Sequence, residues 1–325
     1  KMILEDSMIS KKTNFKIAVQ MDNPHFLDKE GDSTLALIEE ALKKKFGVFI
    51  YLVNDLSLIE NKPVAHMKRV KSLNIKSKDF IKLEKPKLLS LNDFSTILVR
   101  QDPPFNMDYI TSTHILDKVD EKVKIINNPS AIRNSPEKLF VTNFYHMMPP
   151  TIITKNIDTI LKFVKEFKKS VIKPLYGNGG KDVFLLAYSD PNLNVILEKL
   201  LTDGQHLIVQ EFINEVKKGD KRILLIDGEP VGAINRVPKG REIRANLHIG
   251  AFAYKAKLSK RDLLICKEIG PVLKNKGLYF TGIDVINGLI TEINVTSPTC
   301  IREMDKFNKT NIAKIFWEKI QETQF

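Results

Sequence analysis

GIDVINGLITEINVTSPTCIRE (residues 282–303) is the stretch of this chain that decides its fold. Two short segments rich in Ile and Val flank Asn287-Gly288, a dipeptide typical of the tight turn of a β-hairpin. The first segment carries Asp284, and the second carries Glu292 and Asn294. Carboxylate and amide oxygens are ligands for Mg²⁺, which usually binds through one or two carboxylates together with substrate phosphates. The hairpin therefore predicts the metal platform of a phosphoryl-transfer enzyme, if a nucleotide site lies elsewhere in the chain.

The turn decides whether these three side chains share one face of the hairpin. Glu292 and Asn294 are two positions apart, so they point to the same side of their strand. Asp284 joins them only if the loop between the strands has an odd number of residues. We therefore predict a three-residue loop with Gly288 in the left-handed conformation. The alternative is a surface hairpin whose acidic side chains are merely solvated.

The composition is that of a globular protein with more than one domain. The chain has 325 residues, of which 43% are hydrophobic and 28% are charged, a size that suggests two or three domains. Its formal charge of +12 could attract anionic molecules, but the lysines are scattered in short clusters. Since no zinc-finger spacing or RNA-binding motif accompanies them, we expect no nucleic-acid partner.

Cysteine spacing and hydropathy narrow the class of protein to which this chain could belong. Cys266 and Cys300 lie 34 positions apart without CxxC spacing, which disfavours a disulfide scaffold or a structural zinc site. The sequence contains no run of about 18 apolar residues, so we expect no membrane span. The N-terminal residues lack the apolar stretch of a signal peptide. These features predict a cytoplasmic protein.

The first part of the chain predicts a parallel α/β domain. Strand, helix and strand follow one another at residues 15–22, 34–45 and 46–53. A further buried strand spans residues 95–104 and carries Arg100 and Asp102 at its carboxyl end. Open α/β sheets bind their ligands at that end of the strands.

From about residue 140 the pattern changes to helices and hairpins. We expect helices at 158–169, 191–201 and 259–276 and at the C-terminus, strands flanking a Gly-rich loop within 171–187, a strand at 206–213, and hairpins at 221–238 and 282–294. Residues 241–254 have no strong period and are expected to be mobile.

LYGNGGKD (residues 175–182) predicts a phosphate-covering loop. Gly177, Gly179 and Gly180 lie between two apolar strands, where their backbone amides could close over phosphates. The loop matches neither the P-loop nor the dinucleotide fingerprint, and a plain Gly-rich turn is the alternative. Lys173 lies in the preceding strand and needs an anionic partner if it is buried, which a phosphate would supply. Lys138 is a second candidate, although a lone helical lysine is more often exposed.

Three further segments offer binding groups. The strand end Gln210, Glu211, Phe212 and Ile213 could hold an adenine ring between apolar side chains and backbone groups, with a plain core strand as the alternative. Arg222 and Arg236 fall on neighbouring strands of one hairpin, where two guanidiniums could stabilise a transferring phosphoryl group.

A helix start is predicted in the segment TSPTC (residues 296–300). Ser297 is expected at its N-cap and Pro298 at its first position, which would leave free amides for a carboxylate. Cys300 has no accompanying base and is expected to be an apolar filler.

Five blocks together resemble the bacterial glutathione synthetases of the ATP-grasp superfamily: VRQDPPFN (99–106), NNPSAIRNSPEKLF (127–140), IKPLYGNGG (172–180), GDKRILLIDGEPV (219–231) and GLITEINVTSPTCIRE (288–303). The resemblance runs from about Phe15 nearly to the C-terminus. It implies an α/β (α+β) protein with an ATP-grasp fold. After a polar N-terminal extension (1–14), we expect an N-terminal parallel α/β substrate domain (15–126), a small central lid domain (127–205) and a C-terminal antiparallel-sheet catalytic domain (206–325).

The resemblance also implies a reaction, in which ATP drives the joining of γ-glutamylcysteine to glycine through an acyl phosphate. The implied roles are ATP binding by Lys138, Lys173, the Gly-rich loop and Gln210–Ile213, and magnesium or manganese binding by Asp284, Glu292 and Asn294. Arg236 and Asn246 are implied to steady the acyl phosphate, and Arg222 is a further catalytic candidate from its place in the hairpin. Arg100 and Asp102 are implied to bind the dipeptide, and Ser297 and Thr299 to bind glycine. Residues 177–180 and 236–255 are the expected lids, and the expected assembly is a homo-oligomer, either a dimer or a tetramer.

Two departures from the family pattern stand out. Residues 247–257 read LHIGAFAYKAK, where a loop richer in Gly and Arg is expected, and this puts the lid contacts there in doubt. Tyr176 stands where a small or acidic residue is expected, a change that we take to be benign. The alternative function is that of another ATP-grasp carboxylate–amine ligase with a different amino-acid or peptide acceptor.

Overall fold

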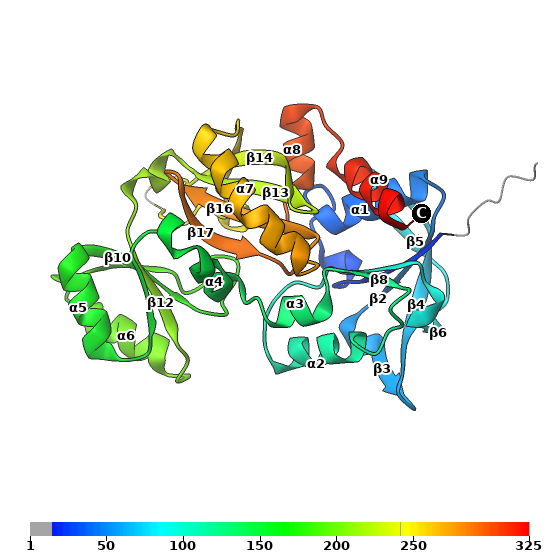
Figure 1. Ribbon diagram of the computed structural model, residues 1–325, viewed down its shortest axis with the longest axis horizontal. Helices are drawn as coiled ribbons and strands as arrows, with labels where there is room; N and C mark the ends of the chain where they lie inside the picture. The colour runs from blue at the N-terminus through cyan, green and yellow to red at the C-terminus, as the bar shows by residue number, and fades with distance from the viewer. Residues whose placement is uncertain (1–14, 241, 325) are drawn as a thin grey trace, which may run out of the picture.

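Three sheets organise the computed structural model, which describes residues 15–240 and 242–324 (Figure 1). The polar extension predicted for residues 1–14 lies outside the described residues. The first sheet combines a parallel core with an antiparallel extension, and the other two are antiparallel.

The first sheet has a parallel core, as the sequence pattern predicts. Its core strands are β1 (Lys16–Gln20), β2 (Gly47–Tyr51), β7 (Thr96–Val99) and β8 (Lys124–Ile126). Antiparallel strands extend it: β3 (Leu56–Ile59), β4 (Lys62–Leu73), β5 (Ile81–Leu83) and β6 (Lys87–Ser90). The accompanying helices are α1 (Ser33–Lys43) and α2 (Met107–Leu116), with short 3₁₀ turns η1 (Pro24–Phe26), η2 (Val53–Asp55) and η3 (Leu91–Asp93).

The second sheet belongs to the middle of the chain and has the order β11-β10-β12-β9. Its elements are β9 (Thr151–Thr154), α5 (Ile157–Phe167), β10 (Lys169–Pro174), β11 (Phe184–Ala187), α6 (Leu193–Leu201) and β12 (Leu207–Glu211). Both helices pack into one apolar cluster with this sheet. Because β12 pairs with β10 and β9, the sheet continues past residue 205, where the sequence suggested a boundary.

The third sheet carries the hairpins and has the order β15-β14-β13-β16-β17. Its strands are β13 (Asp220–Ile226), β14 (Glu229–Val237), β15 (Phe252–Lys255), β16 (Phe280–Ile286) and β17 (Leu289–Asn294). Helix α3 (Pro129–Arg133) packs against α2 beside the first sheet. The other helices and short turns of the chain are α4 (Glu137–Phe140), η4 (Val141–Met147), η5 (Asn214–Lys218), η6 (Leu247–Ile249), α7 (Lys260–Asn275), α8 (Ile301–Asn308) and α9 (Ile312–Gln324).

The predicted mobile segment 241–254 is only partly covered, since Arg241 lies outside the described residues. The remainder includes η6 and most of β15, whose pairing with β14 ties the end of the segment to the sheet.

The central hairpin corrects the predicted turn. Asn287 (φ 50°) and Gly288 (φ 75°) form a two-residue turn, in which both central residues are left-handed. A bulge then leaves Thr291 as the extra residue of β17, so that Asp284 pairs with Glu292. The predicted three-residue loop is therefore wrong, although Gly288 is left-handed. Asp284 reaches the face of Glu292 because the bulge adds the missing residue within the strand.

The predicted helix start at Ser297 is also wrong. Helix α8 begins at Ile301, and Cys300 precedes it in the left-handed conformation (φ 86°). Ser297 instead uses its hydroxyl to donate a hydrogen bond to the carbonyl oxygen of Arg100, 3.2 Å away. This contact holds the segment 297–300 as a loop against the first sheet.

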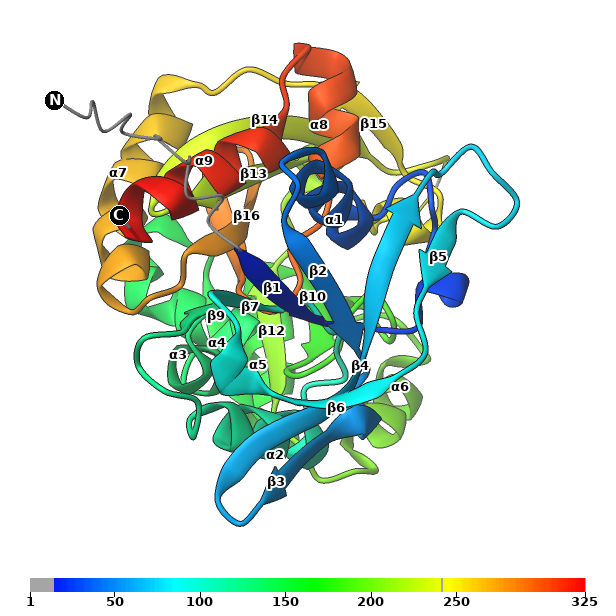
Figure 2. The same ribbon diagram turned by 90° about the vertical axis from the view of Figure 1, so that its right-hand side faces the viewer.

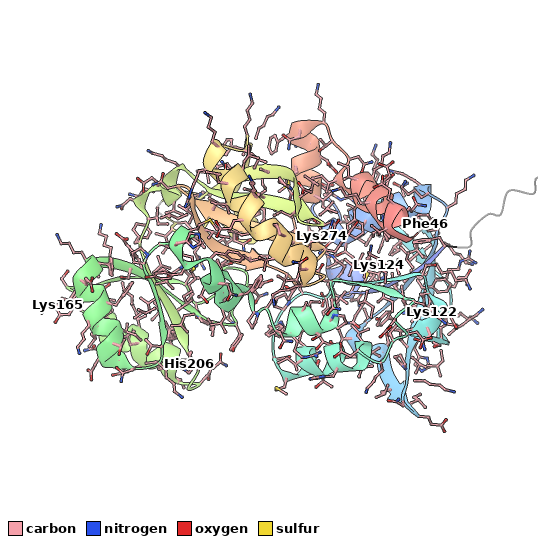
Figure 3. All side chains as sticks on the ribbon, viewed as in Figure 1. Phe46, Lys122, Lys124, Lys165, His206 and Lys274 are labelled. Atoms are coloured by element: carbon pink, nitrogen blue, oxygen red, sulfur yellow. The ribbon has the colours of Figure 1, made fainter. Side chains whose placement is uncertain are left out.

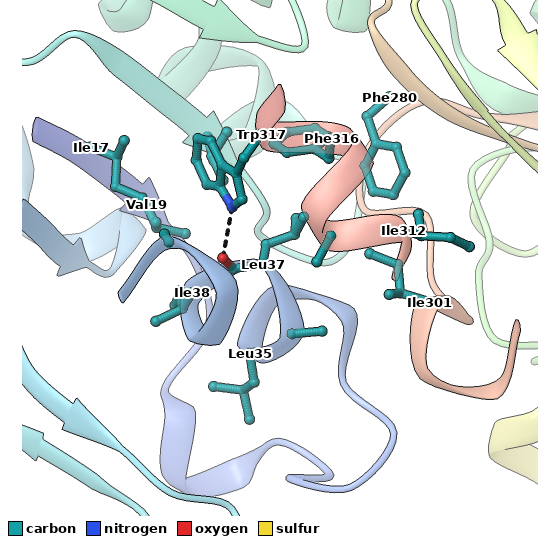
Figure 4. Close-up of a cluster of buried hydrophobic side chains, with 14 of the residues drawn as sticks. Ile17, Val19, Leu35, Leu37, Ile38, Phe280, Ile301, Ile312, Phe316 and Trp317 are labelled. Atoms are coloured by element: carbon teal, nitrogen blue, oxygen red, sulfur yellow. Dashed lines mark hydrogen bonds between the residues drawn. The ribbon is translucent and has the colours of Figure 1, made fainter. Parts of the chain in front are cut away.

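The first and third sheets share one apolar core. Helices α1 and α9 lie side by side in Figures 1 and 2, and residues of both sheets join the same cluster. Trp317 of α9 donates an indole hydrogen bond to the carbonyl oxygen of Leu37 at 2.9 Å (Figure 4). The basic side chains labelled in Figure 3, among them Lys122, Lys165 and Lys274, lie on different parts of the molecule. Within residues 15–240 and 242–324, no helix has the length and apolarity that a bilayer span requires.

Candidate active site

A cleft between the second and third sheets gathers the residues predicted to bind nucleotide and metal. Strands β10 and β12 and the Gly-rich loop line it from the second sheet, and strands β13, β14, β16 and β17 line it from the third. Its lining includes all of the following predicted residues: Lys138, Lys173, Gly177, Gly179, Gly180, Gln210, Glu211, Phe212, Ile213, Arg222, Arg236, Asn246, Asp284, Glu292 and Asn294. Arg100, Asp102, Ser297 and Thr299 are not part of this lining. Segments distant in the sequence thus meet at one cleft, and the roles of their residues remain predictions.

Glu292 is the anionic partner that the buried lysines require. Its Oε1 lies 3.2 Å from Lys173 Nζ and 3.9 Å from Lys138 Nζ. The two lysine side chains are only 14% and 7% exposed. Burial alone would raise the pKa of Glu292, but the two ammonium groups outweigh it and lower that pKa. The sequence predicted an anionic partner at Lys173 and suggested a phosphate, and in the structure Glu292 is that partner.

Asp284 is held by both arginines. It lies directly opposite Arg222 on the neighbouring strand, and Arg222 Nε and Nη2 donate to its two oxygens at 2.5 and 2.9 Å. Arg236 Nη2 lies 3.0 Å from Asp284 Oδ1 and 2.6 Å from Asp220 Oδ2. Burial opposes ionisation of Asp284, yet the two guanidiniums lower its pKa well below the usual value.

The predicted metal ligands fit a hard divalent cation. Asp284 and Glu292 face each other across two adjacent strands, Asn294 lies two residues beyond Glu292, and all three line the cleft. Asn294 Nδ2 lies 3.4 Å from Asp284 Oδ2, so the amide group lies beside the Asp284 carboxylate. Among the described residues no group of three His, Cys, Asp or Glu side chains could hold a metal, so a cation here would need Asn294 and substrate oxygens. Two carboxylates and an amide match that requirement.

Two predicted lid segments touch each other over the cleft. The carbonyl oxygen of Gly177 accepts a hydrogen bond from Lys138, and that of Gly180 accepts one from Arg244 Nη1 at 2.9 Å. Gly180 has φ 75°, which a side chain would strain. Glu242 binds Arg244 in turn, and the hydrogen bond from that guanidinium lowers the pKa of Glu242 to about 2. Sequence reasoning missed Arg244, which has no motif of its own.

The strand end predicted for adenine already uses part of its hydrogen-bonding capacity. Gln210 donates its side-chain amide to Thr151 Oγ1 at 3.1 Å. The amides of Glu211 and Phe212 donate to the carbonyl oxygens of Pro150 and Lys169. A ligand at this edge would therefore meet the carbonyl groups and the Ile213 backbone rather than these amides.

Two of the predicted substrate residues, Arg100 and Ser297, contact each other. Arg100 is buried, and its guanidinium donates to Thr34 Oγ1 and to the carbonyl oxygen of Pro298, both at 3.0 Å. Its own carbonyl accepts the Ser297 hydroxyl. Arg100 thus joins the first sheet to the loop that follows β17. Asp102 is exposed, and its backbone amide donates to Asp22.

Two acidic residues of the site escaped the sequence analysis. Glu137 Oε1 accepts hydrogen bonds from the amides of Val295 and Thr296 and from the Thr296 hydroxyl, which fixes the chain directly after β17. Burial raises the pKa of Glu137, and the charge of Lys138 offsets this only in part. Burial likewise raises the pKa of Asp220 to about 7 in spite of Arg236. Both acids stand beside predicted cations, in SPEKLF and GDKR, and that adjacency was the available signal.

Comparison with known proteins agrees with this architecture. Residues 15–133 match the family model of the prokaryotic glutathione synthetase N-terminal domain, and residues 137–309 match that of the prokaryotic glutathione synthetase ATP-grasp domain. Glutathione synthetases of Brucella melitensis and Mesorhizobium japonicum are each 45% identical over 310 residues, which is 94% of this chain and 98% of theirs. The crystal structure of the D-cycloserine synthetase DcsG superposes with a TM-score of 0.67 at 15% identity, covering 95% of this chain and 100% of that one.

The fold, the cleft and the matching family model define an enzyme of the ATP-grasp class. Within that class, the two family models and the relatives above place the chain in the prokaryotic glutathione synthetase family.

Proposed function

We infer that this chain is an ATP-dependent ligase that joins γ-glutamylcysteine to glycine and releases glutathione, ADP and phosphate. The observation that carries this inference is identity of about 45% to glutathione synthetases along nearly the whole length of both chains. The site supports it, because a Gly-rich loop, buried lysines and paired arginines meet around one cleft. These are the groups that an enzyme needs to handle a triphosphate.

The proposed chemistry begins with activation of a carboxylate. The cysteinyl carboxylate oxygen of the dipeptide attacks the γ-phosphorus of ATP, and the bond to the β-phosphate oxygen breaks to release ADP. The glycine amine then attacks the carbonyl carbon of the acyl phosphate, inorganic phosphate leaves, and a proton is lost from nitrogen. Positioning and charge neutralisation supply most of the catalysis in such transfers.

Different residues of the cleft are proposed to bind the phosphates, the transferring phosphoryl group and the metal ion. We propose that Lys138 and Lys173 neutralise ATP phosphates and that Arg222 and Arg236 stabilise the phosphoryl group in transfer, with Asn246 beside it. Asp284, Glu292 and Asn294 would hold Mg²⁺ or Mn²⁺, which when bound neutralises phosphate oxygens. The arginines and lysines must first release Asp284 and Glu292. The phosphates of the incoming ATP are the anions with which these cations could then pair.

We propose the residues that bind the dipeptide and glycine from their positions in the fold. Arg100 and Asp102 lie at the carboxyl end of β7, where a parallel sheet offers a ligand site, and we assign them to the dipeptide. Ser297 and Thr299 belong to the loop between β17 and α8, and we assign them to glycine. The free helix amides once expected at Ser297 play no part in this assignment. A homo-oligomer, dimeric or tetrameric, remains a prediction from the family resemblance, and a cytoplasmic location remains a prediction from the sequence.

The rival is another ATP-grasp ligase with a different acceptor, because solved ligases of other specificities share this fold. Phosphate release by the purified protein with ATP and magnesium tests the choice, with γ-glutamylcysteine and glycine added separately and together. We expect glutathione and phosphate in equal amounts only when both are present. Release that is indifferent to glycine, or that needs another amine, would favour the rival.

A further inference from the structure

An aromatic contact joins the Gly-rich loop to the first domain. The ring of Tyr176, which directly precedes Gly177, stacks on Phe105 with a centroid distance of 6.1 Å and an interplanar angle of 24°. Phe105 in turn lies 5.3 Å from the ring of Tyr109, which is buried in the core of the first sheet. Three rings therefore lead from that core to the loop. Aromatic pairs at such distances attract beyond the area that they bury.

The same rings close one side of a small pocket. Phe105 and Tyr176 line it together with Thr296 and three residues of the main cleft, Glu137, Lys138 and Gly177. The pocket thus connects the block DPPF, which we assign to the dipeptide, with the end of the cleft assigned to phosphates. A reactive acyl phosphate would form where these two regions meet.

The loop has few other anchors at this point. Lys138 binds the carbonyl oxygen of Gly177 from below, and Arg244 binds that of Gly180 from the second lid segment. Tyr176 is 40% exposed, so its ring is not fixed by burial in its own domain. Its stacking partner is in the domain that would carry the dipeptide, which makes the contact sensitive to the placement of both.

We propose that Tyr176 is a positioning residue whose stacking on Phe105 holds the Gly-rich loop against the DPPF segment (102–105) and keeps water from the acyl phosphate. This inference rests on the proposed function. Without the contact, a water oxygen attacks the carbonyl carbon of the intermediate, the bond to the phosphate oxygen breaks, and the unchanged dipeptide and inorganic phosphate leave. ATP is then consumed without forming glutathione.

Three variants test the contact. Tyr176→Ala removes the ring, whereas Tyr176→Phe keeps it and removes only the hydroxyl. Tyr188→Ala is the matched control, because Tyr188 is also a half-exposed tyrosine of the central domain and its ring contacts only Lys165 among the aromatic and cationic contacts of the described residues. None of these side chains carries a proposed ligand contact.

Hydrogen exchange of residues 175–183 in the ligand-free protein gives the first readout. We expect exchange to be about two- to tenfold faster in Tyr176→Ala, the factor that corresponds to one aromatic pair, and unchanged in Tyr176→Phe and Tyr188→Ala. The second readout is the ratio of phosphate released to glutathione formed with both substrates present. We expect a ratio near one for the wild type and both control variants, and a severalfold higher ratio for Tyr176→Ala.

The two readouts separate the contact from the function. Wild-type exchange or a wild-type ratio in Tyr176→Ala would overturn the proposal, and so would equal effects in Tyr188→Ala. If the wild-type protein makes no glutathione, the proposed function fails and the inferred water exclusion fails with it. Faster exchange in Tyr176→Ala would in that case still identify the stacking as a loop anchor.

Discussion

At the scale of single residues, the cleft neutralises its own charges before any substrate arrives. Asp284 is held by Arg222 and Arg236, and Glu292 is held by two lysines. Buried charges need partners because desolvation otherwise disfavours them strongly. Binding must therefore exchange partners: the carboxylates would turn to a metal ion while the cations would turn to phosphates. ATP and metal should consequently bind with positive coupling rather than independently.

Glu292→Gln tests this exchange. The amide keeps an oxygen for Lys173 but removes the charge that a cation requires, so we expect ADP formation to fall at least 100-fold. Titration calorimetry with Mn²⁺ and an ATP analogue should show weakened metal binding. The melting temperature should drop by only a few degrees, because the lysines keep an acceptor. Retained turnover at ordinary magnesium concentrations would remove Glu292 from the metal site.

The two cysteines give a prediction with a defined pH dependence. Burial raises the pKa of Cys266 to about 12 and also raises that of Cys300, although Arg222 and Arg236 oppose the latter shift. At pH 8 only about one Cys266 in ten thousand would be a thiolate, and that fraction grows about tenfold per pH unit. Iodoacetamide at pH 8 should therefore label neither residue in the folded protein but both in urea, as mass spectrometry can show. Rapid labelling of native Cys300 would instead identify it as a reactive thiol.

The sequence indicated which residues could act as ligands, but it did not indicate which residues they contact in the fold. Asp284, Glu292 and Asn294 stood out because oxygen ligands cluster within eleven positions of one hairpin. Glu137 and Asp220 did not, because their partners lie far away in sequence or on another strand. The only signal of these two acids in the sequence is adjacency to predicted cations, in SPEKLF and GDKR, and such adjacency is also common for solvated acids.

At the scale of elements, periodicity located strands well but could not resolve one inserted residue. A metal site required Asp284 to share a face with Glu292, and we predicted a three-residue loop to achieve this without considering a bulge within a strand. The structure uses the bulge at Thr291 and retains the two-residue Asn287-Gly288 turn. Ser297 failed as a helix start for a similar reason, because a tertiary contact to Arg100 competes with the local capping preference.

Helix α7 offers a test in which packing opposes helix propensity. Gly270 lies inside this helix, where alanine is normally favoured by about 1 kcal/mol. A Cβ atom at Gly270 would lie 2.3 Å from the carbonyl oxygen of Gly228, in the β13–β14 turn. We expect Gly270→Ala to lower the free energy of unfolding by about 1–3 kcal/mol, measured in urea, because turn and helix must separate. Lys267→Ala on the exposed side of α7 is the control, and stabilisation by Gly270→Ala would refute the close contact.

At the scale of the whole molecule, the cores are distributed differently from the sequence order. Sequence blocks suggested three successive domains, and the family match extends along the chain. The apolar cluster around Trp317 nevertheless contains Ile17 and Val19 of the first sheet together with Leu224 and Phe280 of the third. The middle of the chain has a cluster of its own, made of residues between 152 and 209. Sequence periodicity identifies which faces are apolar, but it does not say which distant face covers them.

Trp317 can decide whether the first and third sheets unfold as one unit. It is the sole tryptophan of the chain, it is fully buried, and its indole N–H donates to Leu37 of α1. We expect its fluorescence change in urea to coincide with loss of hydrogen-exchange protection in both β1 and β13. Helices α5 and α6 should open separately and at lower urea, because their apolar contacts stay within the middle segment.

The variant Trp317→Phe tests directly whether the contact of Trp317 with Leu37 stabilises both sheets. Loss of the indole hydrogen bond leaves the carbonyl oxygen of Leu37 without that donor, so the free energy of unfolding should fall by about 1–3 kcal/mol. Hydrogen exchange should report the same loss in β1 and β13, which lie 204 positions apart at their starts but belong to sheets that share the core. The opening of α5 and α6 should be unchanged. If only β1 responded, the shared cluster would be a contact between two domains that unfold independently.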